Sequence, residues 1–225
     1  LYAYNINDKG KAKLAIKPNY GRDERQPQFA DQVISFLPDK KDKILIQGDF
    51  EIANTPGVYE LDLNTLRKKR VQRERSKVTD WIADRQGNVR IARKMDEDEF
   101  EYFLYDEDSL DRRSLFKFKA FSQESVTILG FDKDPNIIYF KAIQNGYDAL
   151  FKMDLTTKKQ ELVFSDDNYD FDGGIFYSPL TGEVAGFTHS NIEEGIRYWD
   201  DDLNKLYTSL RAVLPVDKFD IDIID

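Results

Sequence analysis

The residues best suited to chemistry stand close together towards the C-terminal end of this sequence. His189 is the one histidine among 225 residues, and Glu193 and Glu194 follow it shortly afterwards. A triad that depends on histidine, or a metal site with two histidines, must use His189 or be absent. The chain has no cysteine, which excludes disulfides, thiol catalysis and thiolate metal sites.

These three residues are the candidate substrate-binding residues. His189 follows a short apolar run, 184–188, and is expected in a loop with Ser190 and Asn191. It could line a channel or touch a substrate; the alternative is a loop histidine whose nitrogens are satisfied by water or backbone. The paired carboxylates of Glu193 and Glu194 suit an ammonium group electrostatically, and the alternative for them is a solvated loop.

No serine has the setting of an activated nucleophile. The sequence contains no G-x-S-x-G, the strained strand-to-helix turn that exposes such a serine. Ser178 precedes Pro179 within an expected turn, which is a structural setting. We therefore predict no catalytic residue in this chain.

Carboxylates gather in three places, and none of them predicts a metal site. Asp96-Glu-Asp-Glu and Asp106-Glu-Asp do not follow the calcium-loop pattern D-x-[DN]-x-[DN]-G-x5-E, and the alternation with Phe100 and Tyr102 indicates a hairpin. The last aspartates alternate with apolar residues as in a strand; they are Asp217, Asp220, Asp222 and Asp225. No metal and no cofactor are predicted.

The charge of the chain excludes one class of partner. Lysine and arginine total 33 against 42 aspartates and glutamates, which gives a net charge of −9. Phosphate backbones repel such a surface, so nucleic acid is excluded as a partner. The basic run Arg67-Lys-Lys-Arg-Val-Gln-Arg-Glu-Arg-Ser-Lys has no interleaved aromatics for base stacking, and we expect it to be a solvated turn and edge strand.

Hydropathy indicates a soluble protein. No apolar run approaches the roughly 18 residues that a membrane-spanning helix needs, and no signal peptide is visible. The compartment, cytoplasm or periplasm, stays open. The chain begins with Leu1 rather than methionine, and we expect it to be a piece of a longer protein.

A repeated pattern organises the chain. Val58-Tyr-Glu-Leu-Asp-Leu-Asn-Thr and Leu150-Phe-Lys-Met-Asp-Leu-Thr-Thr share one order of residue types, 92 residues apart, and a third copy starts at Leu1. An aromatic residue before a polar turn recurs at steps of 45, 50 and 45 residues; these aromatics are Phe36, Trp81, Phe131 and Phe176. Repeats of this length, with apolar residues at every second position, are typical of four-stranded β-propeller blades.

The predicted fold class is all-β: a β-propeller fragment of four-stranded blades, about four blades plus part of another, in a single domain over residues 1–225. The partial blade covers 1–16, and the others cover about 33–71, 78–118, 126–163 and 172–225. Four aromatics are expected to pack between blades rather than to form a sugar-binding platform; they are Trp81, Phe131, Phe176 and Trp199. A β-sandwich is the alternative fold. The open strand edges of a fragment predict self-association.

One segment departs from the strand pattern. Leu203, Leu206, Tyr207 and Leu210 fall on one helical face. Carboxylates at 200–202 precede them, where the helix dipole favours negative charge, and Pro215 stops the pattern. We predict one helix, near 203–214, inserted in the last blade.

Several stretches also resemble a known family. They are Val58-Tyr-Glu-Leu-Asp-Leu, Asp80-Trp-Ile-Ala-Asp-Arg-Gln-Gly-Asn-Val-Arg-Ile-Ala, Gly130-Phe-Asp-Lys-Asp, Leu150-Phe-Lys-Met-Asp-Leu-Thr-Thr and the closing run from Tyr169 through Ser178-Pro-Leu-Thr-Gly-Glu-Val to Arg197-Tyr-Trp. In their order they resemble the propeller domain of serine peptidases of the prolyl oligopeptidase family, especially bacterial dipeptidyl-aminopeptidase and acylaminoacyl-peptidase relatives.

The resemblance implies a two-domain enzyme in which the propeller caps an α/β-hydrolase domain and limits access of small peptides to its Ser-Asp-His triad. That catalytic domain, absent from this chain, would be the partner within the same parent polypeptide. In dipeptidyl-peptidase relatives a glutamate pair holds the free amino terminus of the substrate, the role that Glu193 and Glu194 would take, although their context matches that motif poorly.

The chain alone is expected to hydrolyse nothing. Two alternatives remain. One is a stand-alone propeller, like the Tol-system type, that presents loops to a protein partner. The other is a glycan-active propeller enzyme with paired carboxylates in a central pocket.

Overall fold

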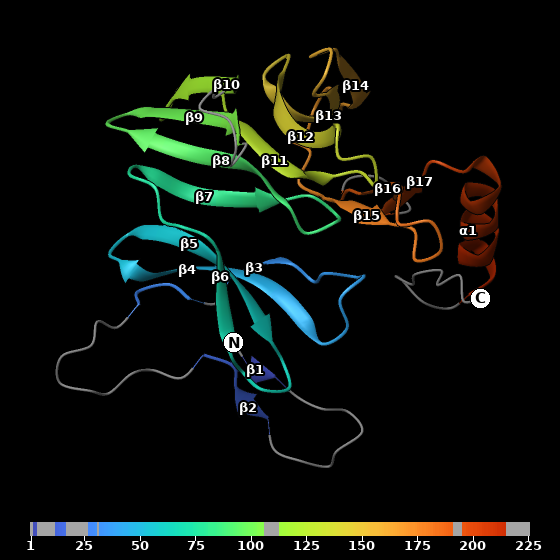
Figure 1. Ribbon diagram of the computed structural model, residues 1–225. Coiled ribbons are helices and arrows are strands. Elements are labelled where there is room, and N and C mark those ends of the chain that lie inside the picture. Colours follow the sequence, from blue (N-terminus) through green and yellow to red (C-terminus); the bar gives the residue numbers. More distant parts are fainter. Residues whose placement is uncertain are drawn as a thin grey trace. The chain divides into compact units, whose positions relative to one another are not determined.

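The computed structural model describes residues 2–3, 12–16, 27–30, 32–105, 113–190 and 195–214 (Figure 1). The chain divides into two compact units, Leu1–Ala120 and Phe121–Asp225. In every sheet of three or four strands, strands that follow one another in sequence are antiparallel neighbours. This order needs only short turns between strands.

The first unit contains two four-stranded sheets and one two-stranded sheet. The first four-stranded sheet consists of β3 (Gln32–Ser35), β4 (Lys43–Ile52), β5 (Thr55–Asp62) and β6 (Lys68–Gln72). The second consists of β7 (Val78–Ala83), β8 (Val89–Asp96), β9 (Glu99–Leu104) and β10 (Arg113–Lys119). β1 (Tyr2–Ala3) pairs with β2 (Lys13–Leu14).

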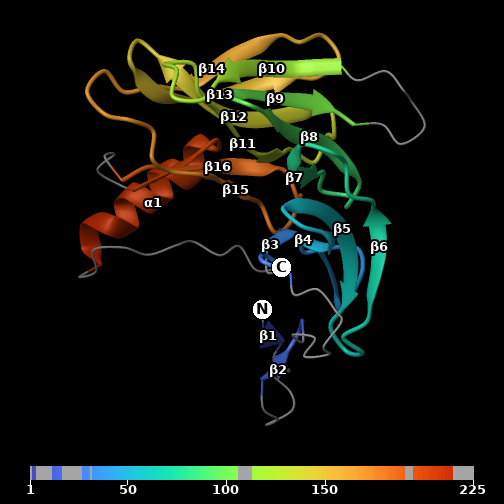
Figure 2. The ribbon, with the colours of Figure 1, turned by 90° about the vertical axis from the view of Figure 1, so that its left-hand side faces the viewer.

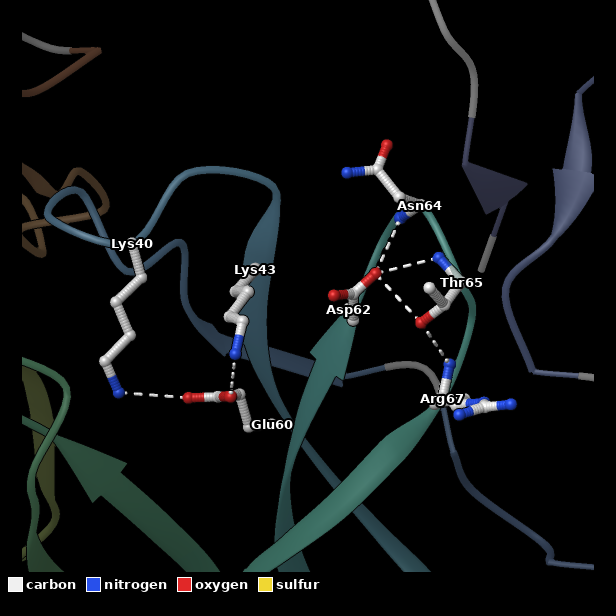
Figure 3. Close-up of polar contacts among 7 residues, drawn as sticks. All are labelled: Lys40, Lys43, Glu60, Asp62, Asn64, Thr65 and Arg67. Atoms are coloured by element: carbon white, nitrogen blue, oxygen red, sulfur yellow. Dashed lines mark hydrogen bonds and ion pairs between the residues drawn. The ribbon is translucent and has the colours of Figure 1, made fainter.

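The aspartate of the repeated motif closes the β5–β6 hairpin. The Asp62 carboxylate accepts hydrogen bonds from the backbone N–H groups of Thr65 (2.8 Å) and Asn64 (3.0 Å) and from the Thr65 hydroxyl (3.0 Å) (Figure 3). These bonds, led by the Thr65 N–H, hold the pKa of Asp62 below its ordinary value. Leu66 completes the turn with a left-handed φ of 58°.

The second copy of the motif builds the same turn in the other unit. Asp154 accepts from the backbone N–H groups of Thr156 (2.7 Å) and Thr157 (3.0 Å), and these bonds, the Thr157 N–H first, lower its pKa. Lys158, four residues after the aspartate as Leu66 is, has a φ of 60°. The repeat seen in the sequence is therefore a repeated turn.

Trp81 lies in the core between the two four-stranded sheets of the first unit. It is 1% exposed, its Nε1 donates to the Pro56 carbonyl of β5 at 2.7 Å, and its ring meets Tyr105 edge-on at 5.0 Å. Gln47 of β4 links the same sheets: its Oε1 accepts from the Trp81 N–H (2.8 Å) and its Nε2 donates to Asp80 (2.9 Å). Apolar packing and this polar bridge together join the two sheets.

The second unit contains one four-stranded sheet, one three-stranded sheet and a helix. The four-stranded sheet consists of β11 (Val126–Phe131), β12 (Ile137–Gln144), β13 (Tyr147–Asp154) and β14 (Gln160–Phe164). The other consists of β15 (Ile175–Tyr177), β16 (Val184–Thr188) and β17 (Ile196–Tyr198). Their shared core includes Tyr139, Leu150, Phe171, Val184 and Phe187.

The helix α1 (Asp201–Val213) lies alongside the three-stranded sheet (Figure 2). Asp200 caps it, because its carboxylate accepts from the backbone N–H groups of Asp202 and Leu203, both at 2.9 Å. On the apolar face Tyr207 is 4% exposed and packs with Tyr198 and Ile196 of β17. The helix is too short to cross a bilayer, and the described residues contain no other helix that could.

The predicted all-β fold class is confirmed: the described residues form antiparallel sheets of the propeller-blade type and one helix. The helix is predicted near 203–214 and observed at Asp201–Val213; it starts two residues earlier because Asp200 caps it. Whether residues 1–225 form one domain stays a prediction.

One detail differs from expectation: Trp199 is 38% exposed, whereas Trp81 and Phe131 are 1% exposed as expected. The last sheet has three strands within the described part of the chain, and the strand expected at 217–225 lies outside that part. Phe36 is 78% exposed, and the next residue, Leu37, is buried.

Candidate functional site

The one histidine lies where two loops of the second unit meet. His189 directly follows β16, and its backbone N–H donates to the Gly195 carbonyl at 3.1 Å. Asp172 stands in the segment that leads into β15. The Thr188 N–H donates to the Gly174 carbonyl, and the Gly174 N–H donates to the Thr188 hydroxyl, so the edge of the sheet brings His189 and Asp172 into contact.

One carboxylate organises this cluster. The side chain of His189 is fully buried, and its Nδ1 donates to Asp172 Oδ1 at 2.8 Å. Ser190 donates its backbone N–H to the same oxygen at 3.1 Å and its hydroxyl to Oδ2. These bonds, the Ser190 hydroxyl first, then its N–H and His189, hold the pKa of Asp172 far below its ordinary value.

The other nitrogen of the imidazole is enclosed by aromatic rings. The His189 ring lies 5.1 Å from Phe164 and 5.6 Å from Phe171, measured between centroids. Its Nε2 is buried and has no hydrogen-bond partner among the described residues. A histidine in this setting fixes a loop to a core.

Aspartate, histidine and serine meet here without forming a catalytic triad. In a triad the serine hydroxyl donates to the histidine, which removes its proton. Here the Ser190 hydroxyl donates to Asp172 instead. The imidazole of His189 also pairs with Asp172 and does not accept the serine proton, so it does not raise the nucleophilicity of Ser190. The cluster can position the loop but lacks an activated nucleophile.

Gly173 makes the contact between His189 and Asp172 possible, and the sequence predictions did not include it. A Cβ on Gly173 would lie 1.5 Å from the Thr188 carbonyl oxygen, whereas one on Gly174 would meet nothing within 4 Å. The Asp172-Gly-Gly sequence was the available signal, since two glycines after a polar residue mark a close backbone approach.

An aromatic hollow of about 410 Å³ lies beside the cluster. Phe164, Phe187 and Trp199 form its apolar wall, and Arg197 and Asn204 are among its polar residues. Phe164 also contacts His189, so the hollow and the histidine share one wall. The hollow could accept an apolar side chain with a polar group at its rim.

The remaining candidates have other settings. Glu193 and Glu194 lie outside the described residues. In the described part of the chain no group of three or more histidine or carboxylate side chains could hold a metal ion. The substrate-binding roles of His189, Glu193 and Glu194 stay predictions.

One further polar cluster has a structural explanation. Glu60 of β5 accepts from Lys43 at 2.6 Å and from Lys40 at 3.0 Å (Figure 3). These two bonds, that of Lys43 first, lower the pKa of Glu60. The ion pairs join the β3–β4 turn to β5 and leave no acid free for chemistry at this position.

No protein-family model and no curated protein matches the sequence. Solved structures to which the chain is similar include TolB from Acinetobacter baumannii (17% identity, 70% of this chain and 37% of that one, TM-score 0.45). They also include an oligogalacturonate lyase in complex with manganese (14%, 73% and 48%, 0.45) and dipeptidyl peptidase 4 from Porphyromonas gingivalis (15%, 75% and 26%, 0.40). The chain spans half or less of the length of these structures.

Proposed function

We propose that this chain is a non-catalytic propeller-type domain of a serine peptidase of the prolyl oligopeptidase type. Its role would be steric: it limits which peptides reach a Ser-Asp-His triad in a separate α/β-hydrolase domain of the same polypeptide. The stretches that resemble this family coincide with strands of all four larger sheets, and the closing run also contains the His189–Asp172 cluster.

The observation that carries the non-catalytic assignment is the engagement of His189. The chain has one histidine, and that histidine is buried against Asp172 while the neighbouring serine donates to the same carboxylate. A peptide hydrolase of this kind needs a histidine that can take the proton of its nucleophile. The triad would therefore belong to another domain.

A serine-directed fluorophosphonate probe tests this assignment. We expect no covalent labelling of the purified chain at concentrations that label a known serine peptidase in the same tube. Labelling that a Ser190→Ala variant abolishes would overturn the assignment, because it would show that Ser190 is an activated nucleophile.

The coding sequence beyond Asp225 tests the gating role. We expect a G-x-S-x-G sequence on a strand-to-helix pattern, followed by an aspartate and then a histidine. In that full-length protein, deletion of one four-stranded sheet should increase the cleavage of folded or long substrates relative to dipeptide amides. A stop codon soon after Asp225 would overturn the gating role and leave the second candidate, a stand-alone propeller that binds a protein partner.

A further inference from the structure

Six cationic side chains line two adjoining hollows in the first unit. The larger hollow has a volume of about 700 Å³, and its cations are Lys40, Arg90 and Arg113. The smaller has a volume of about 370 Å³, and its cations are Arg70, Arg73 and Arg75. Val71 and Gln72 belong to the walls of both, so the hollows adjoin. None of the described residues that line them is a carboxylate.

The larger hollow is assembled from three parts of the chain. Arg90 comes from the start of β8, Arg113 from the start of β10 and Lys40 from the β3–β4 turn. Arg90 forms an ion pair with the buried Asp84 at 3.5 Å, and Lys40 forms one with Glu60. These ion pairs fix the position of two cations whose partners are not themselves in the wall.

The smaller hollow has cations with little neutralisation. Arg70 lies 3.9 Å from both Glu74 and Glu51, at the outer limit of an ion pair. Arg75 donates to the Tyr105 hydroxyl at 3.1 Å, a neutral acceptor. Arg73, and likewise Arg113 in the larger hollow, has no ion pair within the described part of the chain. Positive charge is thus concentrated here on a chain whose net charge is −9.

The chemistry of the lining selects the ligand. Guanidinium groups present planar pairs of donors that match the oxygens of phosphate and carboxylate groups. The larger hollow is by itself big enough for a small molecule, since such sites measure roughly 300–1,000 Å³. Arg75 of the smaller hollow donates to Tyr105 of the larger one, so a side-chain hydrogen bond joins the two walls. Several cations around adjoining, half-open hollows favour a compact ligand with more than one anionic group.

We propose that the two hollows form one binding site for a small polyanion, a molecule with two or more phosphate or carboxylate groups. The site lies within the first unit and does not depend on whether the chain gates a peptidase. The cations of the basic run are exposed, as expected for a solvated edge: Lys68 to Arg70, Arg73 and Arg75 are all exposed. In addition, Arg70, Arg73 and Arg75 line the smaller hollow.

The test is titration calorimetry of the whole chain at low ionic strength with inorganic pyrophosphate and, separately, with citrate. We expect saturable binding of at least one probe, with an affinity that falls as salt is added because the charges are partly exposed. The preferred probe identifies the class of anion, phosphate or carboxylate. Absence of saturable binding of both probes at millimolar concentration overturns the proposal.

Two variants and a matched control locate the site. Arg113→Gln and Arg75→Gln each remove one charge from a side chain that is exposed, so the fold should tolerate them. Each should weaken binding roughly tenfold, since one charge-assisted hydrogen bond contributes that much. Lys119→Gln makes the same change of charge on β10 outside both hollows and should leave the affinity within about twofold. Equal weakening by all three variants overturns the proposal, because it would show attraction to net charge rather than a site.

Discussion

The two tryptophans form a natural experiment on burial. Trp81 is 1% exposed and donates to the buried Pro56 carbonyl, whereas Trp199 is 38% exposed. We predict that Trp81→Phe lowers the free energy of unfolding by about 2–4 kcal/mol. Of this, about 1–3 kcal/mol comes from the carbonyl left without its donor, and about 1 kcal/mol from the space left by the smaller ring.

Trp199→Phe is the matched control. The same substitution there should cost less than about 1 kcal/mol, because Trp199 is partly exposed, water can take the place of its indole N–H, and the smaller ring can still pack beside Phe187 and Tyr139.

Urea unfolding followed by far-UV circular dichroism measures both variants. At a slope of about 2 kcal/mol per molar urea, the Trp81 variant should unfold roughly 1–2 M earlier than the wild type. Equal shifts for the two variants would refute the reasoning, since they would show that the indole N–H and the burial of Trp81 contribute nothing specific.

Four further predictions follow from individual contacts. Gly173→Ala should cost about 3 kcal/mol or more, because its Cβ would strike the Thr188 carbonyl, while Gly174→Ala should be nearly neutral; thermal unfolding that does not separate the two variants would contradict the geometry. Thr65→Val removes one donor to Asp62 and should raise the pKa of that carboxyl towards its ordinary value of about 3.9, with Asp154 unchanged as the internal control in a carbon-detected NMR titration. Asp172→Asn should destabilise the second unit at pH 7. The folded-state pKa of Asp172 is depressed, so its contribution is present above its unfolded pKa, near 3.9, and is lost as the pH falls towards the folded value; a destabilisation equal at pH 7 and pH 3 would argue against this role. Light scattering at rising concentration should show self-association through open strand edges, which a clean monomer throughout would rule out.

The strand pattern was predictable because its causes are local. Tyr59, Leu61 and Leu63 alternate with Glu60 and Asp62, and an aspartate followed by small polar residues closes the turn. The helix was predictable for the same reason: its cap, Asp200, and its buried face, which includes Tyr207, lie within eight residues of each other.

The exposure of the aromatics was less predictable. Trp81 and Trp199 have similar sequence contexts: Trp81 follows Asp80, Trp199 precedes Asp200, and both stand in or beside a strand. Their exposures differ because Trp81 has a second sheet of the first unit on its other side, and Trp199 stands at the end of a short sheet. Similarly, a one-residue offset places Leu37 rather than Phe36 in the core.

The candidate sites depend on contacts that cross long stretches of chain. His189 pairs with Asp172, 17 residues earlier, and no spacing rule connects a loop histidine to a carboxylate in the preceding loop. The cationic hollows combine the basic run with Arg90 and Arg113 from other strands. Counting the charges of the run alone could not show that three arginines face the same space as residues from the next sheet.

The paired hairpin turns at Asp62 and Asp154 have a consequence for redesign. In both, the backbone is fixed by the aspartate and by the left-handed residue four places on, while the two residues between them that donate their N–H groups have exposed side chains. Those positions can therefore accept other side chains without new packing, whereas the left-handed residue differs: Leu66 packs against the core of its unit and Lys158 is exposed. The two hairpins are therefore candidate graft sites: short recognition sequences could replace the exposed turn residues without a change in the sheets.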